Sequence, residues 1–422
     1  MSASSSFHFG NGVTEHHRKR TGSMTGYFDT LETRSADERA ADQLAQAITL
    51  VSRIQAAVGD AYPDGPLASI ADLSRFPVLR KSDLSAWQKA RPPFGGVTMG
   101  AYTHVFQSPG PIYEPGNGSH DWWRFGRFLH AAGIGSSDIV QNCFSYHLTP
   151  AGMMFENGAR AVGAKVFPAG TGQTELQVQA AADIGVTAYA GTPDYLKMIL
   201  DKADEMGVDL SKITRAAVGG GALFPSLRAE YAARGIQCLQ CYGTADLGNI
   251  AYESSAMEGM IIDEGVIVEI VTPGTGTPVA DGEVGEVVVT SLNPDYPLIR
   301  FATGDLSAVL TGQSPCGRTN TRIKGWMGRA DQTTKIKGMF VRPEQVAALV
   351  AKHHEIHKAR IIATREGERD AMTVQIESDA TDGSKFESAV FETLKLRGTV
   401  VVLPKGSLPN DGKVIDDQRS YD

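Results

Sequence analysis

The segment GRADQTTKIKGMFVRPE, residues 328–344, decides how this chain is organised. It joins the flexible residue Gly328 to the charged residues Arg329, Asp331 and Lys335 within a few positions. A glycine next to several charges is typical of a joint between two bodies. We therefore predict a domain boundary at residues 329–331, with a large body before it and a small body after it.

The size and charge of the chain narrow the class of protein. At 422 residues it exceeds what one hydrophobic core usually supports, which favours two domains. A net charge of -8 predicts no nucleic-acid binding, because such binding depends on clustered Lys and Arg. No apolar run approaches the roughly 20 residues of a membrane span, and four scattered cysteines favour a cytoplasmic protein.

The order of the expected elements predicts an α/β fold. Helical and strand-like segments alternate from residue 122 to residue 241, as in a parallel sheet covered by helices. Period-two strands at 266–270 and 286–290 predict an antiparallel β subdomain, and the residues from 330 onward predict a small α+β unit. We expect a disordered N-terminal arm at 1–26, a large domain at 27–329 and a mobile C-terminal domain at 330–422.

Three residues form a candidate set for activating a carboxylic acid. Asp305 can accept two hydroxyl hydrogen bonds from a ribose, Arg329 can bind ribose or phosphate oxygens, and Lys413 can reach an acyl phosphate from a glycine-containing loop. Each also has a plainer interpretation. Asp305 can cap a turn, Arg329 can pair with Asp331, and Lys413 can be a solvated surface lysine. Spacing alone leaves these alternatives open.

With these residues in place, the chain resembles the phenylacetate-CoA ligase branch of the AMP-forming acyl-CoA ligases. The resemblance extends from Tyr27 to Arg419 and is carried by the shared order of several segments. These segments are Asp72–Leu84, Val105–Pro115, Phe144–His147, Gly172–Gln177, Gly191–Pro193, Tyr242–Asp246, Pro297–Arg300 and Gly328–Pro343.

The resemblance implies an acid–thiol ligase that makes an acyl adenylate from ATP and a carboxylic acid and then a CoA thioester. Its fold would be a large adenylate-forming α/β domain with a β subdomain, plus a small α+β domain that rotates about the hinge residue Asp331 between the two steps. The implied ligands are ATP or AMP, CoA and magnesium, and the implied assembly is a homodimer.

The resemblance also implies a role for each candidate site residue. It assigns Lys413 to catalysis and Gly338 to the approach of CoA. It assigns the nucleotide to Gly220, Gly221, Ala222, Tyr242, Gly243, Thr244, Asp305 and Arg329. It assigns the acyl pocket to Phe144, Tyr146, His147, Tyr189, Gly191 and Pro193. Aromatic residues at strand ends are also common in plain cores, so that alternative stays open for the pocket.

Two segments depart from the family pattern. The loop that cradles the ATP phosphates in relatives corresponds here to residues 107–115, which have no lysine and retain only Ser108 and Gly110 as usable contacts. In the family's Tyr-Gly-x-Thr-Glu motif the last two positions are Ala245 and Asp246, so Asp246 is the candidate magnesium ligand.

These departures leave three interpretations of the function. We predict a divergent but active ligase for an aromatic or a small branched or hydroxylated acid. The alternatives are a non-catalytic protein that binds acyl-AMP or acyl-CoA, and an adenylating enzyme that loads a carrier protein instead of CoA.

Overall fold

The computed structural model describes most of the chain. The described residues are 26–58, 65–98, 100–221, 223, 225–327, 330, 334–341, 343–366, 369–409 and 414–419. The predicted disordered arm lies outside them except for Gly26. Within the described residues, no helix is both long and apolar enough to cross a membrane.

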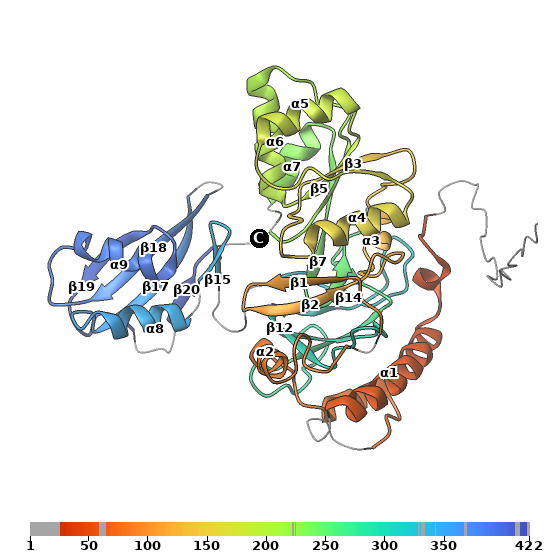
Figure 1. The fold of residues 1–422 in the computed structure, drawn as a ribbon, viewed down its shortest axis with the longest axis horizontal. Helices are drawn as coiled ribbons and strands as arrows, with labels where there is room; N and C mark the ends of the chain where they lie inside the picture. Colours follow the sequence, from red (N-terminus) through yellow and green to blue (C-terminus); the bar gives the residue numbers. More distant parts are fainter. Residues whose placement is uncertain are drawn as a thin grey trace, which may run out of the picture.

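A nine-stranded sheet forms the centre of the large body, with strand order β13-β14-β9-β8-β7-β6-β5-β3-β4. Its parallel half is β4 (Lys165–Phe167), β3 (Ile139–Asn142), β5 (Ala188–Gly191), β6 (Arg215–Val218) and β7 (Gln237–Thr244). The helices between these strands are α4 (Ala151–Ala161), α5 (Thr174–Ile184), α6 (Pro193–Met206) and α7 (Pro225–Ala233), and α3 (Gly126–Ala131) precedes β3. The predicted α/β alternation is confirmed (Figure 1).

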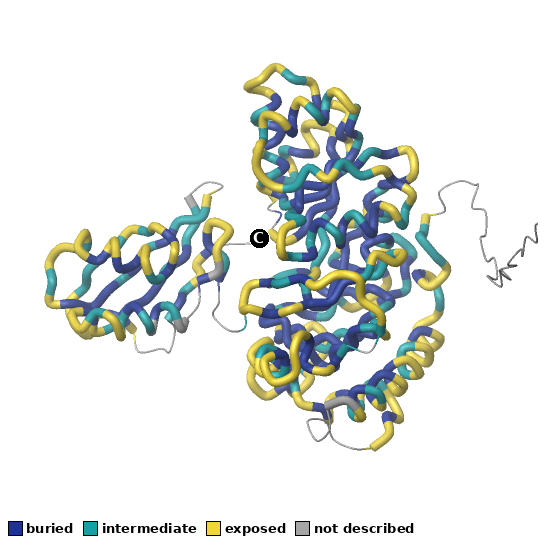
Figure 2. Tube along the Cα trace, viewed as in Figure 1, coloured by how far each residue is buried: buried dark blue, intermediate teal, exposed yellow. Residues whose placement is uncertain are grey.

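Strands β5 and β6 are largely buried on both faces and carry mostly small or apolar residues. In β5, Ala188 and Ala190 pack into one core with α3 and α4, whereas Tyr189 packs into a second core with α5, α6 and α7. This alternation follows from the two-residue period of a strand. Figure 2 shows the same buried strands through the middle of the large body. The carboxyl ends of these strands therefore carry the loops available for a site.

The remaining strands of the large body are antiparallel. The central sheet continues through β8 (Gly248–Tyr252), β9 (Met260–Ile262), β14 (Arg322–Ile323) and β13 (Val309–Leu310). A separate three-stranded sheet contains β10 (Val266–Val271), β11 (Gly285–Ser291) and β12 (Phe301–Ser307), and a hairpin contains β1 (His104–Ser108) and β2 (Ile112–Gly116). The predicted antiparallel subdomain is thus confirmed.

Helix α2 (Lys81–Ala90) is fastened between two of these sheets. Leu79 lies two residues before α2. Its backbone nitrogen donates to the carbonyl oxygen of Arg300, and its carbonyl oxygen accepts from the nitrogen of Ala302, at 2.9 Å each, so this segment pairs with the edge of β12. At the other end of α2, Gln88 bonds both backbone groups of Tyr113 on β2 at 2.7 and 2.9 Å. Helix α2 therefore starts beside β12 and lies against the β1–β2 hairpin.

The described residues from 334 onward pack around a core of their own. They form β15 (Thr334–Ile336), β16 (Met339–Val341), α8 (Pro343–Lys352), β17 (Lys358–Glu366), β18 (Arg369–Glu377), α9 (Ser384–Leu394), β19 (Thr399–Leu403) and β20 (Ile415–Asp417). A four-stranded sheet in the order β19-β18-β17-β20 carries α8 and α9, and the β15–β16 hairpin extends toward the large body (Figure 1). The division at residues 329–331 agrees with this separate core but remains a prediction.

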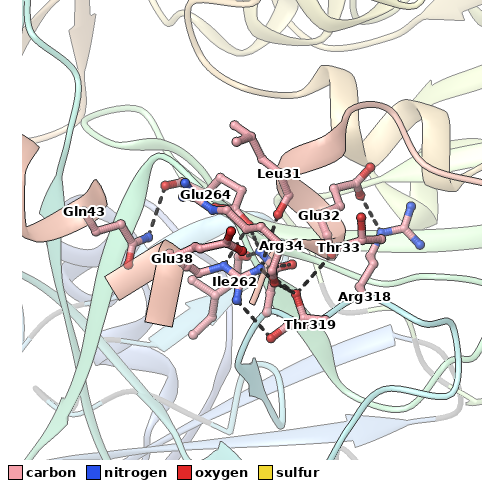
Figure 3. A network of polar contacts seen from close by, with 12 residues as sticks. Leu31, Glu32, Thr33, Arg34, Glu38, Gln43, Ile262, Glu264, Arg318 and Thr319 are labelled. Carbon is pink, nitrogen blue, oxygen red and sulfur yellow. Dashed lines mark hydrogen bonds and ion pairs between the residues drawn. The ribbon is translucent and has the colours of Figure 1, made fainter. Parts of the chain in front are cut away.

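The N-terminal segment is attached to the large body by a buried polar network. The 3-10 helix η1 (Thr30–Thr33) carries Glu32, which is fully buried and accepts hydrogen bonds from Arg318 and, at 2.8 Å, from Tyr252. Next to it, Arg34 at the end of η1 and Arg39 in α1 (Ala36–Val58) both pair with Glu264 (Figure 3). This network fixes α1 against β9 and β14.

Removing one partner of the Glu32–Arg318 pair should strongly destabilise the fold. Replacing Arg318 with alanine leaves a buried carboxylate without its guanidinium, so we expect a loss of about 3–5 kcal/mol in the free energy of unfolding. Urea denaturation measures this. Lys202→Ala, which breaks a surface pair with Glu205, should leave the stability close to that of the wild type. Equal effects of the two substitutions would contradict the importance of the network.

Candidate active site

Asp305 lies at the centre of the candidate site. It belongs to β12, is only 8% exposed, and accepts hydrogen bonds at 2.9 Å from the hydroxyl of Tyr242 and from the indole nitrogen of Trp326. Among the described residues, Tyr242 and Trp326 each donate to a different oxygen of this carboxylate. A carboxylate oxygen can accept more than one hydrogen bond, which is the chemistry needed to bind ribose hydroxyls. The structure therefore brings together two of the predicted nucleotide residues, Asp305 and Tyr242.

The chain returns past Asp305 where the predicted hinge begins. The backbone nitrogen of Ala330 donates to the carbonyl oxygen of Gly304 at 2.7 Å, which places Ala330 directly beside β12. Its neighbours Arg329 and Asp331 lie outside the described residues, as does Lys413. Their predicted roles in nucleotide binding, hinge motion and catalysis therefore remain predictions.

The predicted adenine turn follows β6 and adjoins the predicted acyl segments. Gly220 has a φ of +69°, which favours glycine, and a Cβ there would lie 3.7 Å from the ring of Phe144. A Cβ on Gly221 would lie 3.4 Å from Pro193, whereas Ala222 lies outside the described residues. The bare backbone of this turn is therefore next to two residues predicted for the acyl pocket.

The predicted acyl residues separate into two groups. Phe144 stacks on Phe155 with ring centroids 4.2 Å apart, and the hydroxyl of Tyr146 donates to Glu156 at 3.0 Å, while His147 follows in the same loop. Tyr189 is fully buried, and its hydroxyl donates to the carbonyl oxygen of Thr192 at 3.0 Å.

The ring of Tyr189 is therefore enclosed in a hydrophobic core next to the predicted acyl segment. A Cβ on Gly191 would lie 2.1 Å from the Tyr189 hydroxyl oxygen, so glycine at 191 is required by that buried side chain. Alternate residues of β5 face different cores, and Tyr189 faces the core that contains α5, α6 and α7. The sequence alone did not show that Tyr189 is buried in this way whereas Phe144, Tyr146 and His147 belong to a loop.

Two further predicted nucleotide residues, Gly243 and Thr244, lie at the turn between β7 and β8. A Cβ on Gly243 would lie 2.6 Å from the carbonyl oxygen of Gly248, and the hydroxyl of Thr244 accepts a hydrogen bond from the backbone of Leu247 at 3.2 Å. Both residues therefore shape the turn that carries Asp246. Their direct contact with nucleotide stays a prediction.

The predicted phosphate loop is the tight β1–β2 hairpin. Its backbone is tied to the acyl segment, because the nitrogen of Gln107 donates to the carbonyl oxygen of Leu148 at 2.8 Å. Gly110 lies in the turn between the strands, and the hydroxyl of Ser108 donates to the carboxylate of Glu114. Ser108 is thus engaged with Glu114, a residue that the sequence did not single out.

Glu114 and Asp246 form a buried acidic pair beside this hairpin. Glu114 is 1% exposed and Asp246 is 5% exposed. Burial and the nearby charge of Asp246 raise the pKa of Glu114 to about 8. The ammonium group of Lys81, the first residue of α2, lies 3.2 Å from an Asp246 oxygen. Lys81 of α2 thus lies near the predicted phosphate loop, residues 107–115, which has no lysine of its own.

The β15–β16 hairpin of the C-terminal unit reaches the adenine turn. The ammonium group of Lys335 donates to the carbonyl oxygen of Gly220 at 2.8 Å, and burial lowers the pKa of Lys335. Gly338 lies at the tip of the same hairpin with a φ of +80°. No heavy atom of the described residues lies within 4 Å of a Cβ built on it, so the tip is open.

Comparison with known proteins identifies the family. The model of the AMP-binding enzyme family matches residues 124–293. The phenylacetate-coenzyme A ligase of Aromatoleum evansii is 30% identical over 75% of this chain and 74% of its own length. The enzyme of the same name from Escherichia coli is 30% identical over 83% of this chain and 84% of its own length. The chain belongs to the phenylacetate-CoA ligase family.

Solved structures share the fold. A crystal structure of 2-hydroxyisobutyryl-CoA ligase with 2-HIB-AMP and CoA in the thioesterification state superposes with a TM-score of 0.79 and 22% identity, covering 95% of this chain and 94% of that one. The same ligase in the postadenylation state gives a TM-score of 0.67, covering 92% and 91%. The predicted family, fold class and AMP-forming acid–CoA ligase activity are thereby confirmed.

Proposed function

We propose that this phenylacetate-CoA ligase family member activates an aromatic carboxylic acid as its acyl adenylate and transfers the acyl group to CoA. The observation that carries this proposal is that the predicted nucleotide turn lies next to a pair of aromatic rings. The glycine turn beside Gly220 approaches the ring of Phe144, whose stacked partner is Phe155. An aromatic wall beside a nucleotide turn suits a flat acyl group, because aromatic rings pack well against one another.

The residues of this chain divide the work between two steps. Asp305 and Tyr242 hold the ribose, and Arg329 adds a charged contact. Lys413 stabilises the charge that develops when the carboxylate attacks the α-phosphate. After the C-terminal unit has rotated about Asp331, Gly338 lets the pantetheine arm approach. These roles rest on the family resemblance and on the positions of Asp305, Tyr242 and Gly338 in the structure.

The large body and the C-terminal unit are arranged as expected for the state that forms the thioester. Its support is the higher TM-score with the thioesterification-state ligase than with the postadenylation state, 0.79 against 0.67. A second support is the hydrogen bond from Lys335 to Gly220, which joins the hairpin carrying Gly338 to the large body. In this proposal the Lys335 contact stabilises only the second state.

Lys335→Ala should therefore slow one half-reaction. Loss of a hydrogen bond from a charged group costs about 1.5–3 kcal/mol, which corresponds to roughly 10- to 100-fold in the rate of thioester formation. Single-turnover reaction of preformed acyl adenylate with CoA measures this step. Adenylation, followed as pyrophosphate release, should stay near the wild-type rate. Lys337→Ala is the matched control, since Lys337 bonds within the C-terminal unit. A loss confined to adenylation would contradict the assignment.

Asp246 has the chemistry to hold magnesium. Its carboxylate is buried, and neither oxygen accepts a hydrogen bond from the described residues. Magnesium prefers oxygen ligands, and when bound it would neutralise charge on the ATP phosphates. We also propose, from the family resemblance alone, a cytoplasmic homodimer, for which light scattering should give twice the 45.1 kDa of one chain.

A panel of acids tests the proposed substrate. Phenylacetate, benzoate and 2-hydroxyisobutyrate are each incubated with ATP, magnesium and CoA, and pyrophosphate release and CoA thioester are measured together. Aromatic acids should give the highest kcat/KM. Preference for 2-hydroxyisobutyrate would overturn the aromatic assignment, and adenylate without thioester would favour transfer to a carrier protein.

One observation favours a second candidate, a binding protein without turnover. Ser108, the retained hydroxyl of the phosphate loop, is occupied by Glu114 in this structure. A binder would bind acyl-AMP or acyl-CoA tightly by calorimetry, show no pyrophosphate release with any acid, and be unaffected by Lys413→Ala. Turnover that is lost on this substitution would exclude it.

A further inference from the structure

The altered phosphate loop contains an unusual buried feature. Glu114 lies on β2 and Asp246 lies in the β7–β8 turn, and both side chains are buried and close enough for the charge of Asp246 to act on Glu114. Burying a carboxylate is costly unless it is hydrogen-bonded, paired with a cation or bound to a metal. Two carboxylates together need more compensation than one.

The described residues supply only part of this compensation. Glu114 accepts a hydrogen bond from Ser108 through Oε1, but its Oε2 accepts none, and neither oxygen of Asp246 does. The only cation within ion-pair distance of Asp246 in the described part of the chain is Lys81, whose side chain is 47% exposed. Three buried carboxylate oxygens thus lack hydrogen-bond donors next to a single, partly solvated ammonium group.

Neighbouring elements hold this arrangement in place. Gln88 fixes α2 to β2 next to Glu114, and Lys81 lies seven residues before Gln88, on the same face of the helix. Arg80 makes a two-pronged ion pair with Glu286 at 2.8 and 3.0 Å, which secures the start of α2. Lys81 is therefore positioned by the scaffold, while its exposed side chain can turn toward a ligand.

We propose that Glu114 and Asp246 together bind a divalent cation of the nucleotide, and that Lys81 binds the attached phosphates in place of the lysine missing from the loop. Magnesium is commonly held by one or two carboxylates with substrate phosphates completing its ligands, and the three carboxylate oxygens without a hydrogen-bond donor match that pattern. Within the described residues there is no cluster of three or more His, Cys, Asp or Glu, so the phosphates would supply the remaining ligands. This inference rests on the proposed nucleotide-dependent function and deepens it.

The test measures metal binding directly. The full chain is titrated with Mn²⁺ alone and then with Mn²⁺ and an α,β-methylene analogue of ATP, with free Mn²⁺ followed by electron paramagnetic resonance. Glu114→Gln and Asp246→Asn should each weaken Mn²⁺ binding by about tenfold or more, since even outer partners of metal ligands contribute 10- to 100-fold. Lys81→Met should leave binding of Mn²⁺ alone intact and abolish most of the gain from the analogue.

Controls separate the metal site from folding. Glu258→Gln makes the same charge change at a 58% exposed carboxylate paired with Arg322, and it should bind Mn²⁺ like the wild type. Glu114→Gln keeps an acceptor for Ser108 and removes repulsion from Asp246, so its melting temperature should not fall. Wild-type Mn²⁺ affinity in a folded Glu114→Gln variant would overturn the proposal, as would a wild-type chain that binds no Mn²⁺ with the analogue present.

Ligase turnover, measured in parallel, distinguishes this inference from the proposed function. Mn²⁺ binding lost in Glu114→Gln supports the cation site even if the wild-type chain turns over no acid. Turnover of an acid at wild-type rate by Glu114→Gln leaves the proposed function standing and refutes the role of Glu114.

Discussion

Asp305→Asn should lower the affinity for AMP by roughly 10- to 100-fold without unfolding the protein. Asparagine can keep the contacts with Trp326 and Tyr242, because its oxygen can accept from Trp326 and its amide can donate to the hydroxyl of Tyr242. The variant loses the negative charge and acceptor capacity that the ribose hydroxyls need. Isothermal titration calorimetry with AMP measures the loss, and the melting temperature reports the fold.

Asp295 provides a matched control. Asp295 also accepts a hydrogen bond from a tryptophan, Trp122, at 3.0 Å, but it has no predicted role in nucleotide binding. Asp295→Asn should bind AMP like the wild type. If both substitutions weakened AMP equally, or if Asp305→Asn bound AMP normally, Asp305 would have the plainer role of capping a turn.

The sequence predicted the fold well where hydrophobic periodicity is strong. The spacing of apolar residues predicts helices at Ala151–Ala161 and Thr174–Ile184, and the structure has them with the same bounds. The same spacing predicts a helix from Trp122 to Ala132, but the helix in the structure begins only at Gly126 and ends at Ala131. Asp121 and Arg124 have positive φ values and Asp121 accepts a hydrogen bond from the nitrogen of Gly126, so this stretch forms a turn before the helix. Local turn chemistry overrode the helical pattern there.

The start of α2 shows a second limit. The sequence predicts a capped helix start at Ser82, but the cap in the structure is Arg80, whose backbone nitrogen donates to Asp83. The helix starts earlier because the pairing of Leu79 with β12 fixes the end of the preceding strand-like segment. Such a long-range contact between residues 79 and 301 leaves no local signal in the sequence.

The sequence predicted those site residues that belong to a recognisable motif. It missed those that reach the site only through the packing of distant segments. Asp305 and Tyr242 were singled out from motifs, and the structure joins them by a hydrogen bond. Asp246 was also singled out from a motif, but Lys81 and Glu114 were not, because only tertiary packing brings α2 and β2 next to Asp246. One local signal existed: Ile112, Tyr113 and Glu114 alternate buried, exposed and buried, so the acid occupies an inward position of a short strand.

Lys413→Ala should slow acyl-adenylate formation by about 100- to 1,000-fold, the usual effect of removing one donor at a developing charge. Because Lys413 acts only on the adenylation state in the proposed mechanism, thioester formation from preformed acyl adenylate and CoA should stay near the wild-type rate. Single-turnover assays of the two half-reactions measure this difference. Lys405→Ala, at an exposed lysine in the turn before Leu408, is the matched control and should change neither rate. Equal loss of both half-reactions would show that the residue acts through folding or through a shared site, and the two-state assignment of the C-terminal unit would then fail.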